Sequence, residues 1–438
     1  MLYRKIQLPI ERFLTSNSNK ILVLDGARQV GKTFIIRHVG QKLFPNFIEI
    51  NLKEDAEGDR AFARVHTVKD FYLRLSVIAG QKMGNKSDTL VFLDEIQSYP
   101  HLLTMLKFLK DEDRFTYVAS GSLLGVTLSK TASIPIGSIE TYHLYPLDFE
   151  EFLIANGVGQ EVLNHIHDCF ANRTSLDETL HRLILDKFKR YLLCGGLPDA
   201  VNTLLDTDNI VQLRRLQHEI HAYYGADASQ YDANNRLKIR RVYDMIPSNL
   251  ENKRKRVFAN KIEGKIGKRF SDYAEEFDYL ISAGIALEVK AISQPRFPML
   301  ESSQKNLLKL YLNDVGILTC LLYDRNISAV IDDFKSINLG SVYESVVAQE
   351  LFAHCHQLYY YDNKKHGEID FLIEDFDSLS VMPIEVKSGK DYRVHSALDN
   401  FLRNPDYHIK EAIVLSNNRE VTIQNGITYL PIYYVMFL

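Results

Sequence analysis

Two groups of residues have the types and the spacing to act on phosphate groups. The first is the segment DGARQVGKT, in which Gly26, Gly31, Lys32 and Thr33 keep the spacing G-x-x-x-x-G-K-T. In such a loop, backbone N–H groups surround a phosphate, the lysine reaches the terminal phosphates and the hydroxyl group holds Mg²⁺. The spacing therefore predicts a phosphate-binding loop that takes ATP together with Mg²⁺.

Two later apolar runs end in polar residues that suit the same reaction. Asp94 and Glu95 follow TLVFL, where Asp94 would join Thr33 in the Mg²⁺ shell and Glu95 would polarise the attacking water. Ser120 and Ser122 follow FTYVA and would sense the terminal phosphate, although a plain turn explains them almost as well. The predicted nucleotide-binding residues are Gly26, Ala27, Arg28, Gln29, Val30, Gly31, Lys32, Thr33, Ser120 and Ser122.

The second group lies near the C-terminal end, in EIDFLI and PIEVK. Side chains alternate between the two faces of a strand, so Ile369 and Leu372 should lie on opposite faces. The same alternation lets Asp370, Glu385 and Lys387 converge on one side of a sheet. Carboxylates at that spacing bind Mg²⁺ beside a scissile phosphate, and the lysine can position or activate water.

A further carboxylate strengthens this second group. Glu344 lies on the apolar stripe of a predicted helix, GSVYESVVAQELFAHC, where a buried acid needs a cation partner. We therefore expect Glu344, Asp370 and Glu385 as metal ligands, and Asp370, Glu385 and Lys387 as catalytic residues. The alternative is an amphipathic edge hairpin whose charges are simply solvated.

Secondary-structure patterns place both groups on suitable elements. The run KILVL reads as a buried parallel strand that leads into the phosphate loop, and a helix follows it. Around the second group the predicted order is helix, three strands, helix and strand, which resembles the core of PD-(D/E)XK restriction-type nucleases. The expected fold class is α/β: an AAA-type P-loop domain with a parallel sheet, a helical and winged-helix middle, and a restriction-endonuclease-like C-terminal domain.

Four segments resemble one family in the same order: GARQVGKT, LVFLDEIQ, YVASGSLLG and LYPLDFEEFL. The chain is similar to prokaryotic AAA-type ATPases that carry a C-terminal domain of unassigned function, and CGGLPDAV resembles their Gly-Gly-x-Pro turn. The resemblance implies catalytic roles for Lys32 and Glu95. The family usually has Gly-Arg where this chain has Gly137-Ser138, so an implied arginine is missing. Arg28, Arg114 or a neighbouring copy could replace it.

The middle of the chain is strongly basic. Residues 236–269 hold twelve Lys and Arg residues against three acidic residues, in a chain whose net charge is −4. Helix, glycine and strand signals then follow in the order of a winged helix-turn-helix. We expect DNA-backbone contacts there, whereas the alternative is a segment that only couples two domains. The predicted nucleic-acid contacts are Arg254, Lys255, Arg256, Lys268 and Arg269.

Composition and length bound the rest of the prediction. A chain of 438 residues with 46% hydrophobic and 25% charged residues should form several soluble domains. The expected domains are 1–155 (ATPase), 156–230 (helical lid and connector), 231–310 (winged helix) and 311–438 (nuclease-like). No apolar run is long enough to span a bilayer and no secretion signal begins the chain, so a cytoplasmic location is expected.

The four cysteines, Cys169, Cys194, Cys320 and Cys355, are scattered without a CxxC pair. This pattern favours reduced core thiols over disulfides or a zinc site.

These patterns support two hypotheses about function. The main one is a Mg²⁺-dependent ATPase associated with DNA, carrying a nuclease-like module that either cuts or has lost that activity. The alternative is a nucleotide-dependent switch that binds DNA or protein partners and whose C-terminal carboxylates are inactive. The sequence leaves open whether the chain forms a homo-oligomer.

Overall fold

The structure is a computed structural model, and it describes residues 1–16, 18–122, 137–228, 236–332, 339–363, 367–389 and 392–438. The chain divides into two compact units. The first part of the chain, Arg4–Tyr145 with Ser282–Gly284, forms one unit. Met1–Tyr3, Pro146–Ile281 and Ile285–Leu438 form the other. Within the described residues, no helix is both long and apolar enough to cross a bilayer.

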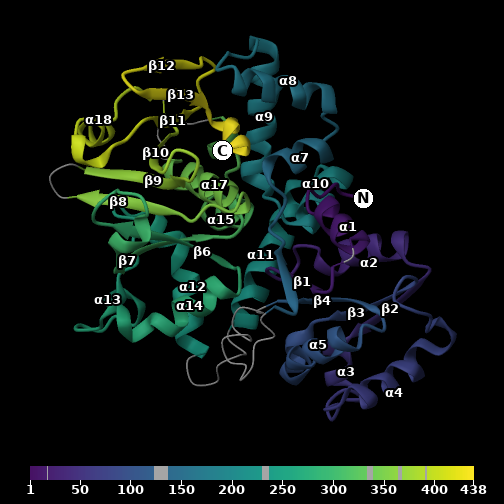
Figure 1. Cartoon of the computed structure of the whole chain (residues 1–438). Helices are drawn as coiled ribbons and strands as arrows, with labels where there is room; N and C mark the ends of the chain where they lie inside the picture. Colours follow the sequence, from purple (N-terminus) through teal and green to yellow (C-terminus); the bar gives the residue numbers. More distant parts are fainter. Residues whose placement is uncertain (17, 123–136, 229–235, 333–338, 364–366, 390–391) are drawn as a thin grey trace. The chain divides into compact units, whose positions relative to one another are not determined.

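The N-terminal unit is built on a five-stranded parallel sheet with the strand order β2-β3-β4-β1-β5 (Figure 1). Because all of its strand pairs are parallel, the carboxyl ends of β1, β3 and β4 meet at one edge. The strands are β1 (Ile21–Asp25), β2 (Asn46–Asn51), β3 (Thr89–Asp94), β4 (Thr116–Gly121) and β5 (Ile139–His143).

Helices cover the faces of this sheet. Side chains of α4 and α5 pack with alternate residues of the strands in one apolar core, which includes Phe71, Leu106 and Val91. The helices are α1 (Gln7–Thr15), α2 (Lys32–Leu43), α3 (Leu52–Glu57), α4 (Val68–Ala79) and α5 (Pro100–Glu112), with short 3₁₀ turns η1 (Gly80–Lys82) and η2 (Ile96–Ser98).

The second unit begins with a set of helices. Helix α7 starts at a capping box, in which the Asp148 side chain accepts a hydrogen bond from the Glu151 backbone N–H and the Glu151 side chain accepts one from the Asp148 backbone N–H. The Asp177 side chain caps α9 in a similar way. The helices are α7 (Phe149–Ala155), α8 (Gln160–Ala171), α9 (Glu178–Cys194), α10 (Pro198–Thr207), α11 (Ile210–Ala228) and α12 (Arg236–Leu250).

The CGGLPDAV turn joins these helices tightly to the rest of the unit. The Gly196 backbone N–H donates to Asp314 at 2.7 Å, and its carbonyl accepts from Leu147 at 2.7 Å. A Cβ on Gly196 would lie 2.0 Å from the Leu147 carbonyl oxygen, so any other residue would force the chains apart. In this unit the turn therefore has a packing role.

The rest of the second unit is an eight-stranded mixed sheet with the order β12-β13-β11-β10-β9-β8-β6-β7. Helix α17 contacts β6, β7 and β10 of this sheet (Figure 1). Leu398 and Phe401 of α18 pack with Ile369 and Val414 of the sheet. The strands are β6 (Ala286–Ile292), β7 (Ser303–Leu312), β8 (Tyr359–Asn363), β9 (Gly367–Asp375), β10 (Ser380–Lys387), β11 (Ala412–Ser416), β12 (Thr422–Gln424) and β13 (Ile427–Pro431). The α-helices are α13 (Ala259–Ile262), α14 (Ala274–Ser282), α15 (Val315–Tyr323), α16 (Ser328–Ile331), α17 (Gly340–Ala353) and α18 (Ser396–Leu402). Short 3₁₀ turns are η3 (Phe270–Tyr273), η4 (Met299–Ser302), η5 (Pro405–Tyr407) and η6 (Ile432–Phe437).

The structure divides the chain differently from the four predicted domains. Strand β6 pairs with both β7 and β8, so the strands predicted for a winged helix belong to the C-terminal sheet. The predicted boundary after residue 310 falls inside β7, and the units separate at Tyr145, not at 155. A two-stranded hairpin is marginal alone, and adding it to a larger sheet satisfies its backbone hydrogen bonds.

Helix α17 carries a second buried carboxylate, which holds the start of α7. The Phe149 backbone N–H donates to the Glu350 carboxylate at 2.9 and 3.1 Å, and the Tyr191 hydroxyl donates at 3.0 Å. Burial, together with the nearby Asp148 carboxylate, raises the pKa of Glu350 to about 7. The folded state therefore favours the protonated form of Glu350.

We expect this carboxylate to make stability depend on pH. Since the folded pKa lies above the unfolded value of 4.5, its contribution is present below that pH and is lost as pH rises through about 7. Glu350→Gln should remove up to about 3 kcal/mol of that pH dependence in denaturant-unfolding free energies between pH 5 and 8. The exposed Glu161→Gln serves as control, and equal pH slopes for wild type and Glu350→Gln would contradict the assignment.

Candidate functional site

The phosphate loop connects β1 to α2 in the N-terminal unit. Gly26 has φ +147°, and a Cβ there would lie 2.3 Å from the Leu144 carbonyl oxygen. Gly31, with φ +97°, forms the left-handed residue at which α2 begins. The Lys32 ammonium donates to the carbonyl oxygens of Gly26 at 2.8 Å and Ala27 at 2.7 Å. Burial lowers the pKa of Lys32, so its charge is held at a cost that an anionic ligand would offset.

The acidic half of the site lies at the end of β3. Thr33 Oγ1 donates to Asp94 Oδ2 at 2.8 Å, and the Ser120 hydroxyl donates to Asp94 Oδ1. Asp94 is buried, and this burial raises its pKa. Three predicted residues from three segments thus meet on one carboxylate, which is the arrangement that Mg²⁺ coordination next to the loop requires.

Glu95 lies one residue beyond Asp94, in the left-handed region with φ +55°. Its carboxylate accepts from Gln97 and from Ser122, the latter at 3.3 Å. Ser122 Oγ also accepts from Gln97 Nε2 and from Arg28 Nε, each at 3.2 Å. Gln97 was not predicted; its place in the segment Asp-Glu-Ile-Gln, beside the expected base, was the available signal.

The structure shows the surroundings of Ser138, where relatives have arginine, and of the two possible replacements, Arg28 and Arg114. Ser138 is buried, and its backbone carbonyl accepts from Ile21 at 2.9 Å. Arg114 precedes β4, and its guanidinium lies 4.8 Å from the centre of the Tyr72 ring. Since the strands are parallel, Arg114 lies at the edge opposite the phosphate loop and cannot serve this site within one chain. Arg28, within the loop, keeps its contact with Ser122.

The second carboxylate group lies where β9 and β10 separate. The last register pair between these strands is Phe371 with Ile384, and beyond it Asp370 Oδ2 accepts from the Val386 backbone at 2.8 Å. Burial, and then the Glu385 and Glu344 carboxylates, raise the pKa of Asp370 well above its usual range. The Asp370 side chain thus replaces the missing strand partner of Val386.

The predicted alternation along β9 is wrong at this point. Ile369 and Leu372 pair with Tyr361 and Tyr359 and lie in the same apolar cluster, instead of on opposite faces. A bulge in the β8–β9 pairing causes this, because three β9 residues span the distance of two β8 residues. Phe371 instead approaches Tyr311, with ring centres 5.9 Å apart.

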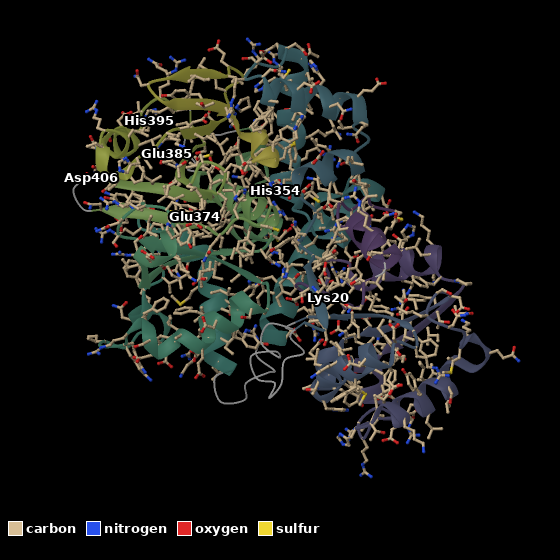
Figure 2. The ribbon with its side chains drawn as sticks, in the orientation of Figure 1. Lys20, His354, Glu374, Glu385, His395 and Asp406 are labelled. Carbon is tan, nitrogen blue, oxygen red and sulfur yellow. The ribbon has the colours of Figure 1, made fainter. Side chains whose placement is uncertain are left out.

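Glu385 and Lys387 lie together at the end of β10 (Figure 2 labels Glu385). Lys387 Nζ donates to Glu385 Oε1 at 2.7 Å. Glu385 Oε2 is buried and has no hydrogen-bond partner within the described residues. Burial raises the pKa of Glu385. Burial alone would lower the pKa of Lys387, but the Glu385 carboxylate next to it raises that pKa. Burying a carboxylate oxygen without a partner is costly, and a nearby cation would offset that cost.

Glu344 comes to this group from α17, and it is already neutralised. The Lys255 ammonium forms an ion pair with Glu344 Oε1, and the Tyr311 hydroxyl donates to Oε2 at 3.1 Å. Burial alone would raise the pKa of Glu344, but Lys255 and Lys309 together lower it. Glu344 therefore has the cation partners expected for a buried acid, and these partners are lysine side chains.

Lys309 is a further cation of the group that was not predicted. It lies on β7 with a side chain only 1% exposed, forms an ion pair with Glu368, and lies 4.6 Å from the Tyr360 ring centre. Burial would lower its pKa, yet the Glu344, Glu368 and Asp370 carboxylates raise it. We call the set Lys255, Lys309, Glu344, Glu368, Asp370, Glu385 and Lys387 the carboxylate–lysine cluster.

The cluster provides donors that suit a divalent cation, with Glu385 Oε2 left without a partner. Within the described part of the chain, the ligand oxygens of Glu344, Asp370 and Glu385 do not form a group in which all lie within 4.8 Å. Lys255 also pairs with one of the predicted ligands. The prediction that Glu344, Asp370 and Glu385 together hold a metal ion therefore conflicts with this geometry at Glu344, whose cation partner is Lys255.

The predicted nucleic-acid residues fall into two sets. Lys255 and Arg256 point inward: Lys255 to Glu344, and Arg256 to Asp362 at 3.5 Å, with both side chains 18% exposed. The expectation that these two contact DNA conflicts with this geometry, because partly buried ion pairs already hold their charges. Arg254 and Arg269 are exposed. Lys268 lies between these extremes, 3.9 Å from Glu263.

Comparison with protein families identifies the first of these sites. Residues 18–153 match a family model described as an AAA domain. Residues 18–153 are therefore an AAA-type domain. The AAA-type domain thus comprises the phosphate loop, Asp94, Glu95 and the two serines, together with the start of the second unit.

The remainder of the chain matches families without an assigned activity. Residues 185–328 match a domain of unknown function, DUF8612, and residues 339–435 match a second one, DUF4143. The carboxylate–lysine cluster draws Lys255 and Lys309 from the first match and its other members from the second. The comparison with curated proteins found no match.

Solved structures resemble the chain only at low sequence identity. A Walker-type ATPase of Pyrococcus abyssi is 13% identical, with a TM-score of 0.46, over 74% of this chain and 96% of that chain. The ORC1 protein of Aeropyrum pernix, solved in complex with DNA, is 13% identical, with a TM-score of 0.26, over 75% and 94%. The Hsp104–ADP complex of Saccharomyces cerevisiae is 15% identical, with a TM-score of 0.31, over 80% and 48%. Since all three TM-scores are below 0.5, we draw no conclusion from them.

Proposed function

We propose that the AAA-type domain hydrolyses ATP with Mg²⁺, and that the second unit acts on DNA through a nuclease-like site. The observation that carries the first part is the meeting of Thr33 and Ser120 on Asp94 beside Lys32. Thr33 and Asp94 would hold Mg²⁺, which supplies charge neutralisation at the phosphates. Lys32 would bind the terminal phosphates, and Glu95, oriented by Gln97, would accept the proton of the attacking water.

Substitution of Glu95 tests the role of the base. Glu95→Gln keeps the shape of the side chain and its neighbours, so ATP binding should be retained while hydrolysis slows by at least about 100-fold. Nucleotide fluorescence measures binding, and phosphate release measures turnover. The exposed Glu57→Gln in the same unit serves as control. A normal hydrolysis rate in Glu95→Gln would remove Glu95 as the base.

The second part of the proposal is a restriction-endonuclease-like module that cleaves DNA with a divalent cation. The buried Glu385 Oε2 next to Lys387, at the end of the β9–β10 pairing, carries this part. Asp370 and Glu385 would hold the cation, which stabilises charge on a scissile phosphate. Lys387 would donate a hydrogen bond to a phosphate oxygen or to the attacking water. The test is metal-dependent DNA cleavage that is lost when Asp370 is changed.

One observation favours the second candidate function, a nucleotide-dependent switch without cleavage. Lys255 pairs with Glu344, and Lys387 with Glu385, so each of these carboxylates already has a lysine partner. A site neutralised in this way can stabilise the fold without binding a metal. If the wild-type protein binds DNA but cuts no duplex, single-stranded or branched substrate with Mg²⁺ or Mn²⁺, the switch is the better description.

DNA contact by the basic segment is expected to involve its exposed arginines. The double variant Arg254→Ala, Arg269→Ala should weaken DNA binding and reduce the slope of log affinity against log salt by about 2. Lys255→Met should leave that slope unchanged, because Lys255 faces Glu344. Arg182→Ala, whose side chain is 73% exposed on α9, serves as a surface control. An unchanged slope in the double variant would argue against backbone contacts by these arginines.

A further inference from the structure

Three residues of different chemical type lie close together outside both sites. The ligand atoms of His218, Cys320 and Asp324 all lie within 4.8 Å of one another. Within the described residues, this is the group of three His, Cys, Asp or Glu side chains that is close enough to hold one metal ion. His218 Nε2 lies 3.0 Å from Asp324 Oδ1. His218 belongs to α11, whereas Cys320 lies on α15 and Asp324 directly follows it. The group therefore bridges two packed helices.

The fold explains why these side chains meet. Cys320 and Asp324 are four residues apart, and the backbone at Asp324 remains helical, so both side chains lie on one face. Helix α11 packs against α15 and brings His218 to that face. The Cys320 thiol donates to the carbonyl oxygen of Arg214, one turn before His218, at 3.5 Å. The sulfur lies buried at the base of the group.

The two other donors lie toward solvent. The side chains of His218 and Asp324 are 47% and 41% exposed. An ion held by the three would therefore keep one side open to water, which can supply a fourth ligand. Imidazole, thiolate and carboxylate are the donors that Zn²⁺ takes in proteins, in tetrahedral sites.

We propose that His218, Cys320 and Asp324 bind one transition-metal ion of the Zn²⁺ type, which fastens α11 to the end of α15. Tetrahedral zinc with these donors has ligand atoms about 3–4 Å apart. In the structure His218 Nε2 and Asp324 Oδ1 are 3.0 Å apart and all three ligand atoms lie within 4.8 Å of one another, so only small side-chain movements are needed. No activity is assigned to the ion, since its role is to hold the two helices.

Binding at this site has a defined proton balance. A cysteine binds a metal ion as the thiolate. The ion must therefore replace the thiol proton: the S–H bond and its hydrogen bond to Arg214 are lost, a metal–sulfur bond forms, and one proton is released to solvent. Affinity should accordingly rise with pH.

The charges around the site tolerate a divalent ion. The Asp324 carboxylate and the Cys320 thiolate would together neutralise it. The Arg214 guanidinium lies near Cys320: its Nη1 donates to Gln217 at 2.8 Å and to Thr319 at 3.2 Å, whereas its buried Nε and Nη2 have no hydrogen-bond partner within the described residues. With the ion bound, the ion and its two anionic ligands carry no net charge together, so the Arg214 charge should not prevent binding.

The test uses the full-length protein after dialysis against a chelator, with Co²⁺ and Zn²⁺ as the added ions and no nucleotide. Co²⁺ should produce the near-ultraviolet absorption of a cobalt–thiolate bond, and this absorption should correspond to one thiolate-bound ion per chain. Titrations in buffers of different ionisation enthalpy should show release of about one proton. Because the carboxylate–lysine cluster has no thiol, that absorption separates the two sites.

Variants decide whether the three residues are the ligands. Cys320→Ser should abolish the cobalt–thiolate absorption, and His218→Ala or Asp324→Asn should weaken Zn²⁺ binding at least about tenfold. The exposed Cys355→Ser serves as the thiol control and should change neither. Unchanged Zn²⁺ affinity in His218→Ala and Asp324→Asn, or absorption lost in Cys355→Ser, would overturn the proposal. The two exposed positions keep the test valid if Cys320→Ser does not fold.

Discussion

Lys32→Ala is expected to reduce ATP hydrolysis to the background level, at least about 100-fold below wild type, because the lysine of a phosphate loop binds the terminal phosphates and neutralises their charge. The Lys32 ammonium donates hydrogen bonds to two loop carbonyl oxygens at 2.7 and 2.8 Å. When ATP binds, its phosphate oxygens can replace these carbonyls as acceptors. Phosphate release under saturating ATP and Mg²⁺ measures the effect.

Loss of folding would not explain this result. Burial lowers the pKa of Lys32, so its buried charge destabilises the nucleotide-free protein, and alanine should leave the melting temperature equal or higher. Lys20→Ala is the matched control: it lies just before β1, its side chain is 41% exposed, and it pairs with Glu140 at 3.5 Å. Turnover that persists in Lys32→Ala would refute the phosphate-loop assignment itself.

Asp370→Asn is expected to abolish metal-dependent DNA cleavage, with a loss of at least about 100-fold, if the second unit is a nuclease. The amide keeps an oxygen that can accept from Val386, and since burial raises the pKa of Asp370, removal of its charge should not destabilise the fold. The variant should therefore fold normally while losing the anionic ligand that a cation requires.

The matched control is Asp377→Asn, an exposed residue in the turn between β9 and β10. Cleavage of supercoiled, duplex, single-stranded and branched DNA should be compared with Mg²⁺, with Mn²⁺ and with chelator. Equal cleavage by wild type and Asp370→Asn would assign the activity elsewhere. Absence of cleavage in the wild type, with DNA binding intact, would favour the nucleotide-dependent switch.

The two sites differed in how far the sequence could predict them. The prediction of an AAA-type domain is confirmed by the family match over residues 18–153, and its ATP hydrolysis stays a proposal. Its key residues are either contiguous, as in the loop, or lie at the ends of parallel strands, as Asp94 and Ser120 do. Such strands end at one edge whatever the details of packing, so a linear pattern contains most of the geometry.

The carboxylate–lysine cluster depended more on tertiary structure. Alternation along β10 was enough to group Glu385 with Lys387, but alternation along β9 failed because a bulge re-aims its residues. The role of Lys255 and Lys309 as partners of these acids could not be predicted, because both lysines lie in residues 231–310, which the sequence assigned to a separate winged-helix domain. Only the addition of β6 and β7 to the C-terminal sheet brings these lysines to the acids.

The sequence by itself determined the phosphate loop, the acidic strand end and the choice of Glu344, Asp370, Glu385 and Lys387 as chemically relevant residues. These follow from short-range spacing and from the periods of helices and strands. The tertiary structure alone decided which cations neutralise the acids, which arginines remain exposed, and that His218 meets Asp324, 106 residues away in the chain. Contacts of that range depend on how whole elements pack, and no local pattern records them.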